Sequence, residues 1–192
     1  MTNSLKGTRT EKNLLAAFAG ESQARNRYEF FMKVAINECY EQIAAIFQET
    51  ANQEKEHAKR FFKFLEGGMA EITASFPAGV IGTTIENLKA AAEGEHEEWS
   101  ELYPTFAEIA MEEGFKEIAT AFKMIAKVET EHERRYLKLL QSVSEDRVFM
   151  KEGKVWWKCR NCGYVYESEK ALEKCPACLH SKAFMQVREE NY

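Results

Sequence analysis

Apolar side chains recur every three or four residues along most of the chain, which is the spacing of an amphipathic helix. The pattern breaks at three places, near residues 37–40, 67–79 and 112–115. It therefore predicts four long helices, which cover residues 9–37, 40–66, 80–111 and 115–144.

After Arg147 the pattern changes. The segment VFMKEGKVWWKCRNCGYVYE is rich in aromatic and β-branched residues and contains glycine turns, which predicts short strands. We therefore expect a mainly α protein made of two modules, a four-helix bundle over residues 1–147 and a small β-rich module over residues 154–192.

Two polar residues interrupt the apolar stripe of the second predicted helix. Glu54 and His57 fall in the same register as the apolar residues Ile43, Phe47, Phe61 and Phe64. A single Glu-x-x-His pair on a helix is usually a solvated pair. The rest of the chain therefore decides whether these two side chains face water or a metal.

An internal repeat supplies that context. The segment CYEQIAAIF, which begins at Cys39, matches GFKEIATAF, which begins 75 residues later. The same offset pairs Glu54 with Glu129 and His57 with His132, and an offset of 74 pairs Glu21 with Glu95. The helical region thus consists of two copies of a helical hairpin, each carrying one Glu followed by Glu-x-x-His.

Hairpin geometry predicts that these residues meet. Glu21 and Glu54 are equidistant from the first turn, and Glu95 and Glu129 are equidistant from the second. Each pair lies about 25 Å from its turn at the rise of an α-helix. Buried carboxylates cost several kcal/mol each, and two divalent cations would offset that cost. One Glu from each of two helices, with Glu-x-x-His from the other two, is the ligand set of carboxylate-bridged di-iron bundles.

The third predicted helix carries a surplus carboxylate. Glu98 lies one turn after Glu95 and has no counterpart in the first hairpin; the apolar residues that continue nearby are Leu102, Phe106 and Ile109. A surplus carboxylate lets one metal exchange His57 for Glu98 between oxidation states, because ferric iron favours anionic oxygen over imidazole. The alternative is that Glu98 only supports a ligand.

Two tyrosines, Tyr28 and Tyr103, occupy roughly corresponding places in the two halves. They either donate hydrogen bonds to ligand carboxylates or bury their rings while the hydroxyl groups bond elsewhere.

The C-terminal module carries Cys159, Cys162, Cys175 and Cys178, spaced as two Cys-x-x-Cys pairs. This spacing predicts one tetrahedral thiolate site. A segment this short buries little core, so a metal is expected to stabilise it. Spacing alone leaves zinc and a single FeS4 iron open. The aromatic residues expected to enclose the site favour iron; they are Trp156, Trp157, Tyr164 and Phe184.

Composition narrows the functional classes. The net charge of −5 argues against a nucleic-acid partner. No apolar run reaches the length of a membrane span, and the first residues do not form a secretory signal. We therefore expect no membrane partner and a cytoplasmic location. Cys39 stands apart from the other cysteines and is expected to be an ordinary thiol.

Several segments in order resemble the rubrerythrin family over the whole chain. They are GTRTEKNLLAAFAGESQARNRY, QEKEHAKRFFKFLEGG, AAEGEHEEWSELYP, VETEHERRYL and CRNCGYVYE with CPAC. The resemblance implies a ferritin-like di-iron bundle followed by a rubredoxin-like domain. It also implies a non-haem peroxidase that reduces hydrogen peroxide to water and protects the cell against oxidative stress.

The same resemblance implies three Fe per chain, with zinc as a possible substitute. One iron would be held by Glu21, Glu54 and either His57 or Glu98, the other by Glu95, Glu129 and His132. Glu54 and Glu129 would bridge the two irons, and the four C-terminal cysteines would hold the FeS4 iron. One departure is visible, because rubredoxins usually have Gly after the last cysteine and this chain has Leu179.

The resemblance further implies electron transport from an external donor, such as a rubredoxin or an NAD(P)H-dependent reductase, and a head-to-tail homodimer or a larger homo-oligomer. Two rivals remain. A ferroxidase that uses dioxygen to handle iron would leave the cysteine module without a role. A non-catalytic electron carrier with zinc in its tail would leave Glu98 without one.

Overall fold

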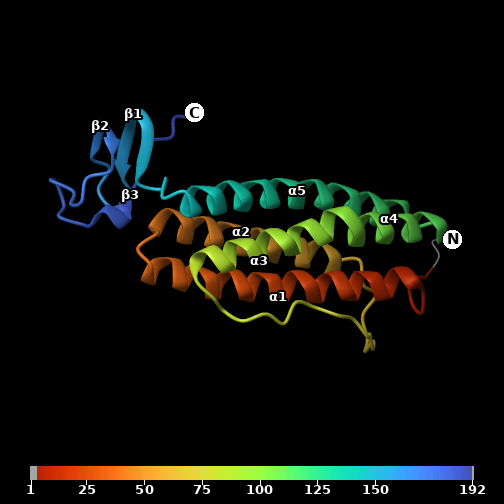
Figure 1. Ribbon diagram of the computed structural model, residues 1–192. Helices are drawn as coiled ribbons and strands as arrows, with labels where there is room; N and C mark the ends of the chain where they lie inside the picture. The colour runs from red at the N-terminus through yellow and green to blue at the C-terminus, as the bar shows by residue number, and fades with distance from the viewer. Residues whose placement is uncertain (1–3, 192) are drawn as a thin grey trace.

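The computed structural model describes residues 4–191 and is mainly helical (Figure 1). The outermost residues of the two expected modules, 1–3 and 192, lie outside the described part. The helices are α1 (Arg9–Asn37), α2 (Glu41–Phe62), α3 (Thr84–Glu97), α4 (Tyr103–Glu112) and α5 (Lys116–Ser144). A π-helical turn, Glu98–Leu102, joins α3 to α4, so that these segments form the third of four helical rods.

Local capping explains where the helices begin and end. Thr8 caps α1 by accepting a hydrogen bond from the backbone N–H of Glu11. Thr83 and Glu86 form a capping box, so α3 begins at Thr84 rather than at the predicted residue 80. Helix α2 ends at Phe62 rather than at residue 66. Beyond it, the backbone N–H groups of Phe64 and Leu65 bond to carbonyls three residues earlier rather than four. A turn follows in which Gly67 has a φ of 79°, a backbone conformation that favours glycine.

The segment between α2 and α3 determines the topology. Residues 66–83 run beside α1 from the end of the bundle where α2 stops to the end where α3 begins (Figure 1). Consequently α1 pairs with α2, and the α3–α4 rod pairs with α5, as two hairpins. This arrangement agrees with the repeat seen in the sequence.

The π-helical turn corrects one expectation about the third rod. Past this turn the buried residues are Tyr103, Ala107 and Ala110. The apolar residues Leu102, Phe106 and Ile109, which continue the spacing after Glu98 in the sequence, are exposed or only partly buried. Pro104 gives the physical reason, because its ring cannot donate a backbone hydrogen bond and clashes with the carbonyl one turn before it. The backbone N–H of Tyr103 instead bonds to the carbonyl of Glu98, and the extra residue in the turn moves the buried face by one position.

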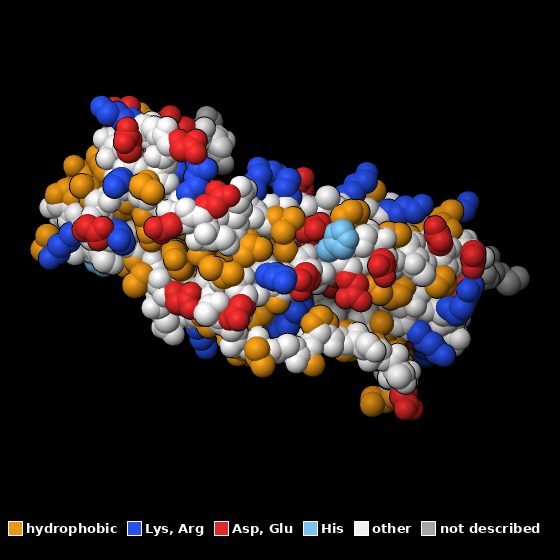
Figure 2. Space-filling model, viewed as in Figure 1, with side chains coloured by type: hydrophobic (Ala, Val, Ile, Leu, Met, Phe, Trp, Pro, Cys, Tyr) orange, Lys and Arg blue, Asp and Glu red, His pale blue; other side chains and the backbone are white. Residues whose placement is uncertain are grey.

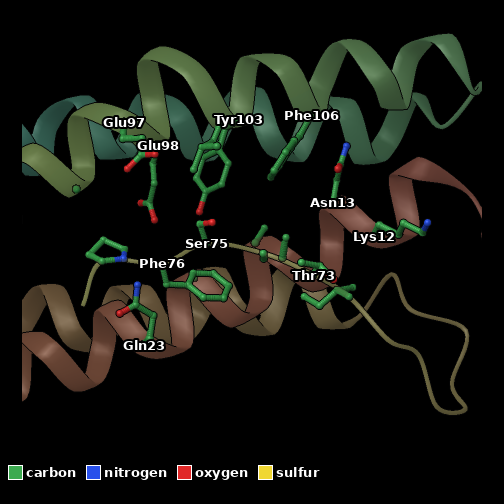
Figure 3. Close-up of a pocket in the computed structure, with 18 of the residues that line it drawn as sticks. Lys12, Asn13, Gln23, Thr73, Ser75, Phe76, Glu97, Glu98, Tyr103 and Phe106 are labelled. Atoms are coloured by element: carbon green, nitrogen blue, oxygen red, sulfur yellow. The ribbon is translucent and has the colours of Figure 1, made fainter. Parts of the chain in front are cut away.

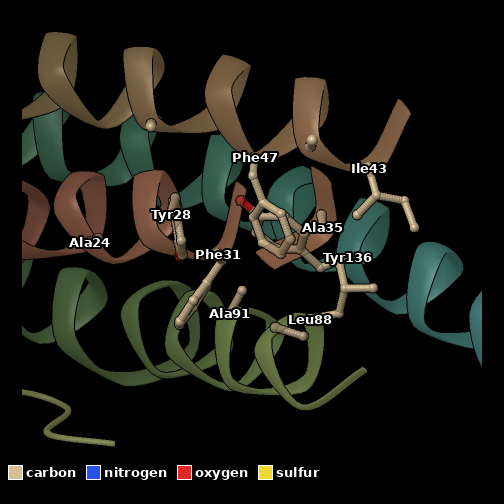
Figure 4. Close-up of a cluster of buried hydrophobic side chains, with 12 residues drawn as sticks. Ala24, Tyr28, Phe31, Ala35, Ile43, Phe47, Leu88, Ala91 and Tyr136 are labelled. Carbon is tan, nitrogen blue, oxygen red and sulfur yellow. The ribbon is translucent and has the colours of Figure 1, made fainter. Parts of the chain in front are cut away.

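Two apolar clusters fill the bundle, one towards each end. The first includes Tyr28, Phe31, Phe47, Leu88 and Tyr136, whose side chains come from α1, α2, α3 and α5 (Figure 4). The second includes Leu14, Phe61, Tyr103, Phe122 and Ile125. Along each helix, the inward Glu falls between residues of the first cluster and residues of the second. The carboxylates therefore form a polar layer enclosed by two apolar ones.

The strands β1 (Met150–Cys159), β2 (Val165–Lys170) and β3 (Met185–Val187) form an antiparallel sheet in the order β2-β1-β3. This sheet lies beyond the end of α5, near the turn between α1 and α2 (Figure 1). The Tyr40 ring stacks on the Phe149 ring there, with 6.0 Å between the ring centroids.

The surface carries both signs of charge. On the face shown in Figure 2, acidic and basic side chains are interspersed rather than gathered into one patch. Among residues 4–191, we find no helix long and apolar enough to cross a membrane.

One surface carboxylate ties α1 to the end of α4. Glu113 accepts hydrogen bonds from the backbone N–H groups of Arg9 and Thr10 and from the Thr10 hydroxyl. Partial burial opposes ionisation, but these bonds lower the pKa of Glu113 to about 2, from 4.5. We predict that Glu113→Gln lowers the free energy of unfolding at pH 7 by about 1–2 kcal/mol.

The sign of the pH dependence follows from the lowered pKa. The contribution of Glu113 to the free energy of unfolding is fully present above pH 4.5 and is lost as the pH falls towards 2. Urea unfolding of wild type and variant should therefore converge in acid. Glu112→Gln is the matched control, because Glu112 is exposed and, within residues 4–191, pairs only with the Arg9 side chain. An equal loss in both variants at pH 7 would contradict the assignment.

Candidate metal centres

Each of the four rods contributes inward polar residues at one level of the bundle. Glu21 comes from α1, Glu95 from α3, Glu54 and His57 from α2, and Glu129 and His132 from α5. Their oxygen and nitrogen atoms form two groups, in each of which all four ligand atoms lie within 4.8 Å of one another. One group is Glu21, Glu54, His57 and Glu129, and the other is Glu54, Glu95, Glu129 and His132. Glu54 and Glu129 belong to both groups.

Both imidazole rings point Nδ1 at the carboxylates. His57 Nδ1 lies 2.9 Å from Glu54 and 3.0 Å from Glu129. His132 Nδ1 lies 2.7 Å from Glu129 and 3.1 Å from Glu54. The two rings are 6.0 Å apart between centroids. The arrangement is therefore nearly symmetric about the shared carboxylates.

The donor set fits divalent cations. Several buried atoms that face the cluster have no hydrogen-bond partner of acceptable geometry within residues 4–191; they are Glu21 Oε2, Glu54 Oε1, both Glu129 carboxylate oxygens and His132 Nδ1. Such orphaned acceptors are costly in a protein interior. The cluster contains four carboxylates and two imidazoles, and its two ligand groups have Glu54 and Glu129 in common. This donor set matches the ligand chemistry of a two-metal carboxylate site.

Without cations, protons neutralise part of the charge of the cluster. Burial and repulsion from Glu54 raise the pKa of Glu95 to about 8. Burial also raises the pKa of Glu21 well above its usual value. Burial opposes the charged form of His132, yet the close carboxylates of Glu129 and Glu54 raise its pKa to about 12. Metal binding must displace these protons.

Two tyrosines brace the carboxylates across the hairpins. The Tyr28 hydroxyl donates to Glu95, and the Tyr103 hydroxyl donates to Glu21. Both rings are buried in the flanking apolar clusters. Each Tyr thus fixes the Glu of the opposite hairpin, and both descriptions considered for these residues apply together: the ring is in the core and the hydroxyl bonds to a carboxylate.

Glu98 is not a member of either group of four. It lies in the π-helical turn, half-buried, at the edge of a cavity of about 700 Å³. Figure 3 shows Glu98 and Tyr103 pointing from the third rod towards α1 and towards the loop that carries Ser75 and Phe76. Burial and the charge of Glu21 raise the pKa of Glu98 well above its usual value. The surplus carboxylate therefore stands between the cluster and the cavity.

One polar neighbour of the cluster was not singled out from the sequence. Gln53 Oε1 lies 3.0 Å from His132 Nε2, on the side of the ring that faces away from the carboxylates. The internal repeat could have identified Gln53, because the offset of 75 that matches the ligands aligns this polar residue with the apolar Val128.

The four cysteines of the C-terminal module converge. Cys159 Sγ lies 3.7 Å from Cys178 Sγ, and Cys162 Sγ lies 3.6 Å from Cys175 Sγ. A tetrahedral metal with bonds of about 2.3 Å to sulfur sets neighbouring sulfurs about 3.8 Å apart, so the spacing fits one metal. The cysteines are not disulfide-bonded. The backbone N–H of His180 lowers the pKa of Cys178 to about 6, which favours the thiolate.

The aromatic surroundings of this site differ in one respect from expectation. Trp157 is fully buried against the cysteines, with Tyr164 and Phe184 packed nearby. Trp156 is instead 51% exposed, because successive side chains of a strand point to opposite faces. Three of the four expected aromatic residues therefore lie at the site.

Comparison with known proteins gives a consistent result. The family model described as rubrerythrin matches residues 12–140, and the model described as the rubredoxin-like domain of rubrerythrin matches residues 157–186. A rubrerythrin of Porphyromonas gingivalis is 65% identical over 100% of this chain and 96% of its own length. A rubrerythrin of Nitratidesulfovibrio vulgaris is 58% identical over 96% of each chain.

Solved structures agree at the level of the fold. A fully reduced, all-ferrous nigerythrin is similar, with a TM-score of 0.63 and 30% identity over 97% of this chain and 92% of the other. A bacterioferritin of Mycobacterium tuberculosis, with a TM-score of 0.63 and 19% identity over 76% of this chain and 90% of its own, shares the fold alone. The helical region is therefore ferritin-like.

Leu179 generates a prediction about the cysteine site. It has a φ of 64°, in the left-handed region, and its side chain is 64% exposed. A non-glycine residue in this conformation costs about 1–2 kcal/mol of folding stability. Glycine avoids this strain, and the stability that it costs through its greater freedom in the unfolded chain is smaller. We predict that Leu179→Gly raises the stability of the module by about 0.5–1 kcal/mol.

Guanidinium unfolding, followed by the thiolate-to-metal absorption band, measures this effect. Leu172→Gly is the matched control, since Leu172 is exposed in the same module and has no positive φ. We expect that control to lower stability. A loss of stability in Leu179→Gly would show that the leucine side chain contributes more than its backbone strain removes.

Proposed function

Because this chain belongs to the rubrerythrin family, we propose that it is a non-haem di-iron peroxidase that reduces hydrogen peroxide to water. The observation that carries the proposal is the buried cluster of carboxylates and imidazoles beside a cavity, in one chain with a four-thiolate site. The reaction takes two electrons and two protons for each peroxide. We further propose that it protects the cytoplasm against oxidative stress.

The residues present fit the metals that this activity needs. One iron would be held by Glu21, Glu54 and either His57 or Glu98, and the other by Glu95, Glu129 and His132. Glu54 and Glu129, which belong to both groups of ligand atoms, would bridge them. The pair of ferrous ions supplies two electrons, one from each metal. With one iron on the four cysteines, the chain holds three Fe, and zinc is a possible substitute.

The residues around the cluster admit peroxide and deliver protons. The cavity opens on Glu98, and burial and the charge of Glu21 raise the pKa of its carboxyl, which favours the protonated form. A neutral carboxyl at this position can hold a proton for an oxygen that leaves as water. The apolar clusters on both sides of the layer exclude bulk water from the rest of the cluster.

The C-terminal module returns electrons one at a time. Cys162 is exposed, which gives an external donor access to the thiolate site. Helix α5 continues for 15 residues after Glu129, or about 22 Å, before the chain turns towards this module. We therefore propose a head-to-tail homodimer, or a larger homo-oligomer, in which the module of one subunit serves the di-iron site of another.

We propose as donor a rubredoxin or an NAD(P)H-dependent reductase, and as functional units the bundle, residues 1–147, and the rubredoxin-like domain, residues 154–192. The ferroxidase alternative uses dioxygen and gives the four cysteines no role.

Anaerobic oxidation by peroxide tests the proposal. We load the protein with iron, reduce it fully and add one equivalent of hydrogen peroxide while following the thiolate-bound iron by visible absorption. We expect rapid oxidation of that iron, because electrons run from the cysteines through the bundle to peroxide. Glu54→Ala and Glu129→Ala should slow it by at least 100-fold, about the loss expected when a metal centre is disrupted.

Glu98→Gln tests the proton, because an amide cannot deliver one. We expect a decrease of about 10²–10⁴-fold with bundle iron still bound. Glu101→Gln is the matched control, since Glu101 is exposed in the same π-helical turn and does not line the cavity. Oxidation by dioxygen but not by peroxide would establish the ferroxidase alternative instead.

A further inference from the structure

The two histidines of the cluster differ at the ring nitrogen that faces away from it. His132 Nε2 lies 3.0 Å from Gln53 Oε1. His57 Nε2 has no protein hydrogen-bond partner within the part of the chain that the structure describes. The His57 side chain is also more open, with 13% of its surface exposed against 4% for His132. At Nε2, therefore, His132 has a protein partner and His57 has none within the described residues.

The internal repeat shows that this difference is built into the sequence. The offset of 75 that pairs His57 with His132 also pairs Gln53 with Val128. Helices α2 and α5 run antiparallel (Figure 1), and Gln53 contacts His132 across them. By the repeat, Val128 is the residue equivalent to Gln53 for His57. A valine side chain cannot accept a hydrogen bond. The two halves of the bundle thus supply an acceptor to one histidine only.

The residues that hold Gln53 follow the same asymmetry. Arg135 donates to Glu49 at 2.7 Å and to the Thr50 hydroxyl, and its Nη2 lies 3.5 Å from Gln53 Oε1. The repeat aligns Glu49 and Thr50 with Met124 and Ile125, which cannot bond to Arg60, the counterpart of Arg135.

Arg60 instead pairs with Glu117 and lies over the Phe64 ring, 4.5 Å from its centroid. The polar support is therefore present around His132 and has no equivalent around His57.

The chemistry of a ligated imidazole gives this asymmetry a consequence. When Nδ1 offers its lone pair to a metal, the proton resides on Nε2, and the Nε2–H group of His132 can donate a hydrogen bond to Gln53 Oε1. Such a bond fixes the ring orientation, and removing it from a metal-binding histidine typically lowers the affinity for the metal by about 10–100-fold. His57 can rotate without breaking a bond of this kind.

Glu98 is placed on the side of the unsupported histidine. A Cβ atom added to Gly20 would lie 3.8 Å from Glu98 Oε1. Gly20 precedes Glu21, which shares a ligand group with His57 and not with His132. The surplus carboxylate and the loosely held imidazole therefore belong to the same half of the site.

We propose that Gln53 is a positioning residue that fixes His132, and that Val128 at the equivalent position leaves His57 as the histidine that gives way to Glu98. This inference rests on the proposed function, because the exchange matters only if the two metals change oxidation state. It assigns the difference in how firmly the two histidines are held to one pair of residues outside the ligand set.

Hydrogen exchange at the histidine rings tests the proposal without any peroxide. The chain has four histidines, so selective ¹⁵N labelling of the zinc-loaded, full-length protein gives a simple NMR spectrum. We expect the His132 Nε2–H to exchange with solvent at least about tenfold more slowly than that of His57, because only the former is bonded. Gln53→Val should abolish the difference, and Gln53→Glu, which keeps an acceptor, should retain it.

The reciprocal variant and a matched control sharpen the result. Val128→Gln should slow the exchange of the His57 ring by about the same factor, because it supplies the missing acceptor. Gln42→Val should change nothing, since Gln42 lines the same groove between α2 and α5 but makes no bond to His132. Equal exchange of the two rings in the wild type, or no effect of Gln53→Val, would overturn the proposal.

Crystal structures of the ferrous and ferric proteins test the exchange itself. We expect oxidation to displace His57 and leave His132 in place, whereas the double variant Gln53→Val/Val128→Gln should retain His57. Displacement of His57 in the double variant as well would overturn the proposal. The NMR result is independent of peroxide chemistry, so a failure of the proposed peroxidase activity and a failure of this inference are distinguishable.

Discussion

The structure depends on one constraint, the burial of four carboxylates and two imidazoles in a single layer between two apolar clusters. Glu21, Glu54, Glu95 and Glu129 have at most 1% of their surface exposed, and several of their oxygens lack a hydrogen-bond partner within residues 4–191. Protons can neutralise such a layer only in part, whereas two divalent cations neutralise it and use the orphaned atoms as ligands. The matched hairpins and the buried tyrosines hold these ligands at one height.

A nearly two-fold symmetric bundle carries asymmetric chemistry. The ligands and the two tyrosines repeat in both halves, but Glu98 and the support of His132 by Gln53 occur once. Pro104 contributes to the first difference, because the π-helical turn that accompanies it begins at Glu98 and shifts the buried face of the third rod. The second difference follows from Gln53 and Val128. The first difference places Glu98 at the edge of the cavity.

Much of this could be predicted from the sequence, because the signals were periodic and repeated. The stripe of α5, with Glu129 and His132 among its apolar residues, is buried as the spacing indicates, and the residues of both hairpins meet at one level. The comparisons confirm the family, the mainly helical fold and the two kinds of domain. The assignment of each ligand to a particular metal stays a prediction.

The errors came from features that break the regular spacing. A π-helical turn adds one residue to a helix, so the regular spacing continues through Leu102 and Phe106 whereas the structure buries Tyr103 and Ala107. The aromatic composition of the segment does not distinguish Trp156 from Trp157, whereas the alternation of side chains along a strand decides which of them faces the cysteines. Gln53 was overlooked because a polar residue beside a buried stripe resembles a solvated one until its partner across the helix pair is known.

The central claim is that Glu54 and Glu129 are shared by two irons in the bundle while a third iron binds the cysteines. Anomalous diffraction at the iron absorption edge, on crystals of the iron-loaded protein, tests it directly. The account predicts three peaks per chain, two of them within bonding distance of both Glu54 and Glu129 and one among the four Sγ atoms. A single peak in the bundle, or two peaks that do not share these carboxylates, would contradict it.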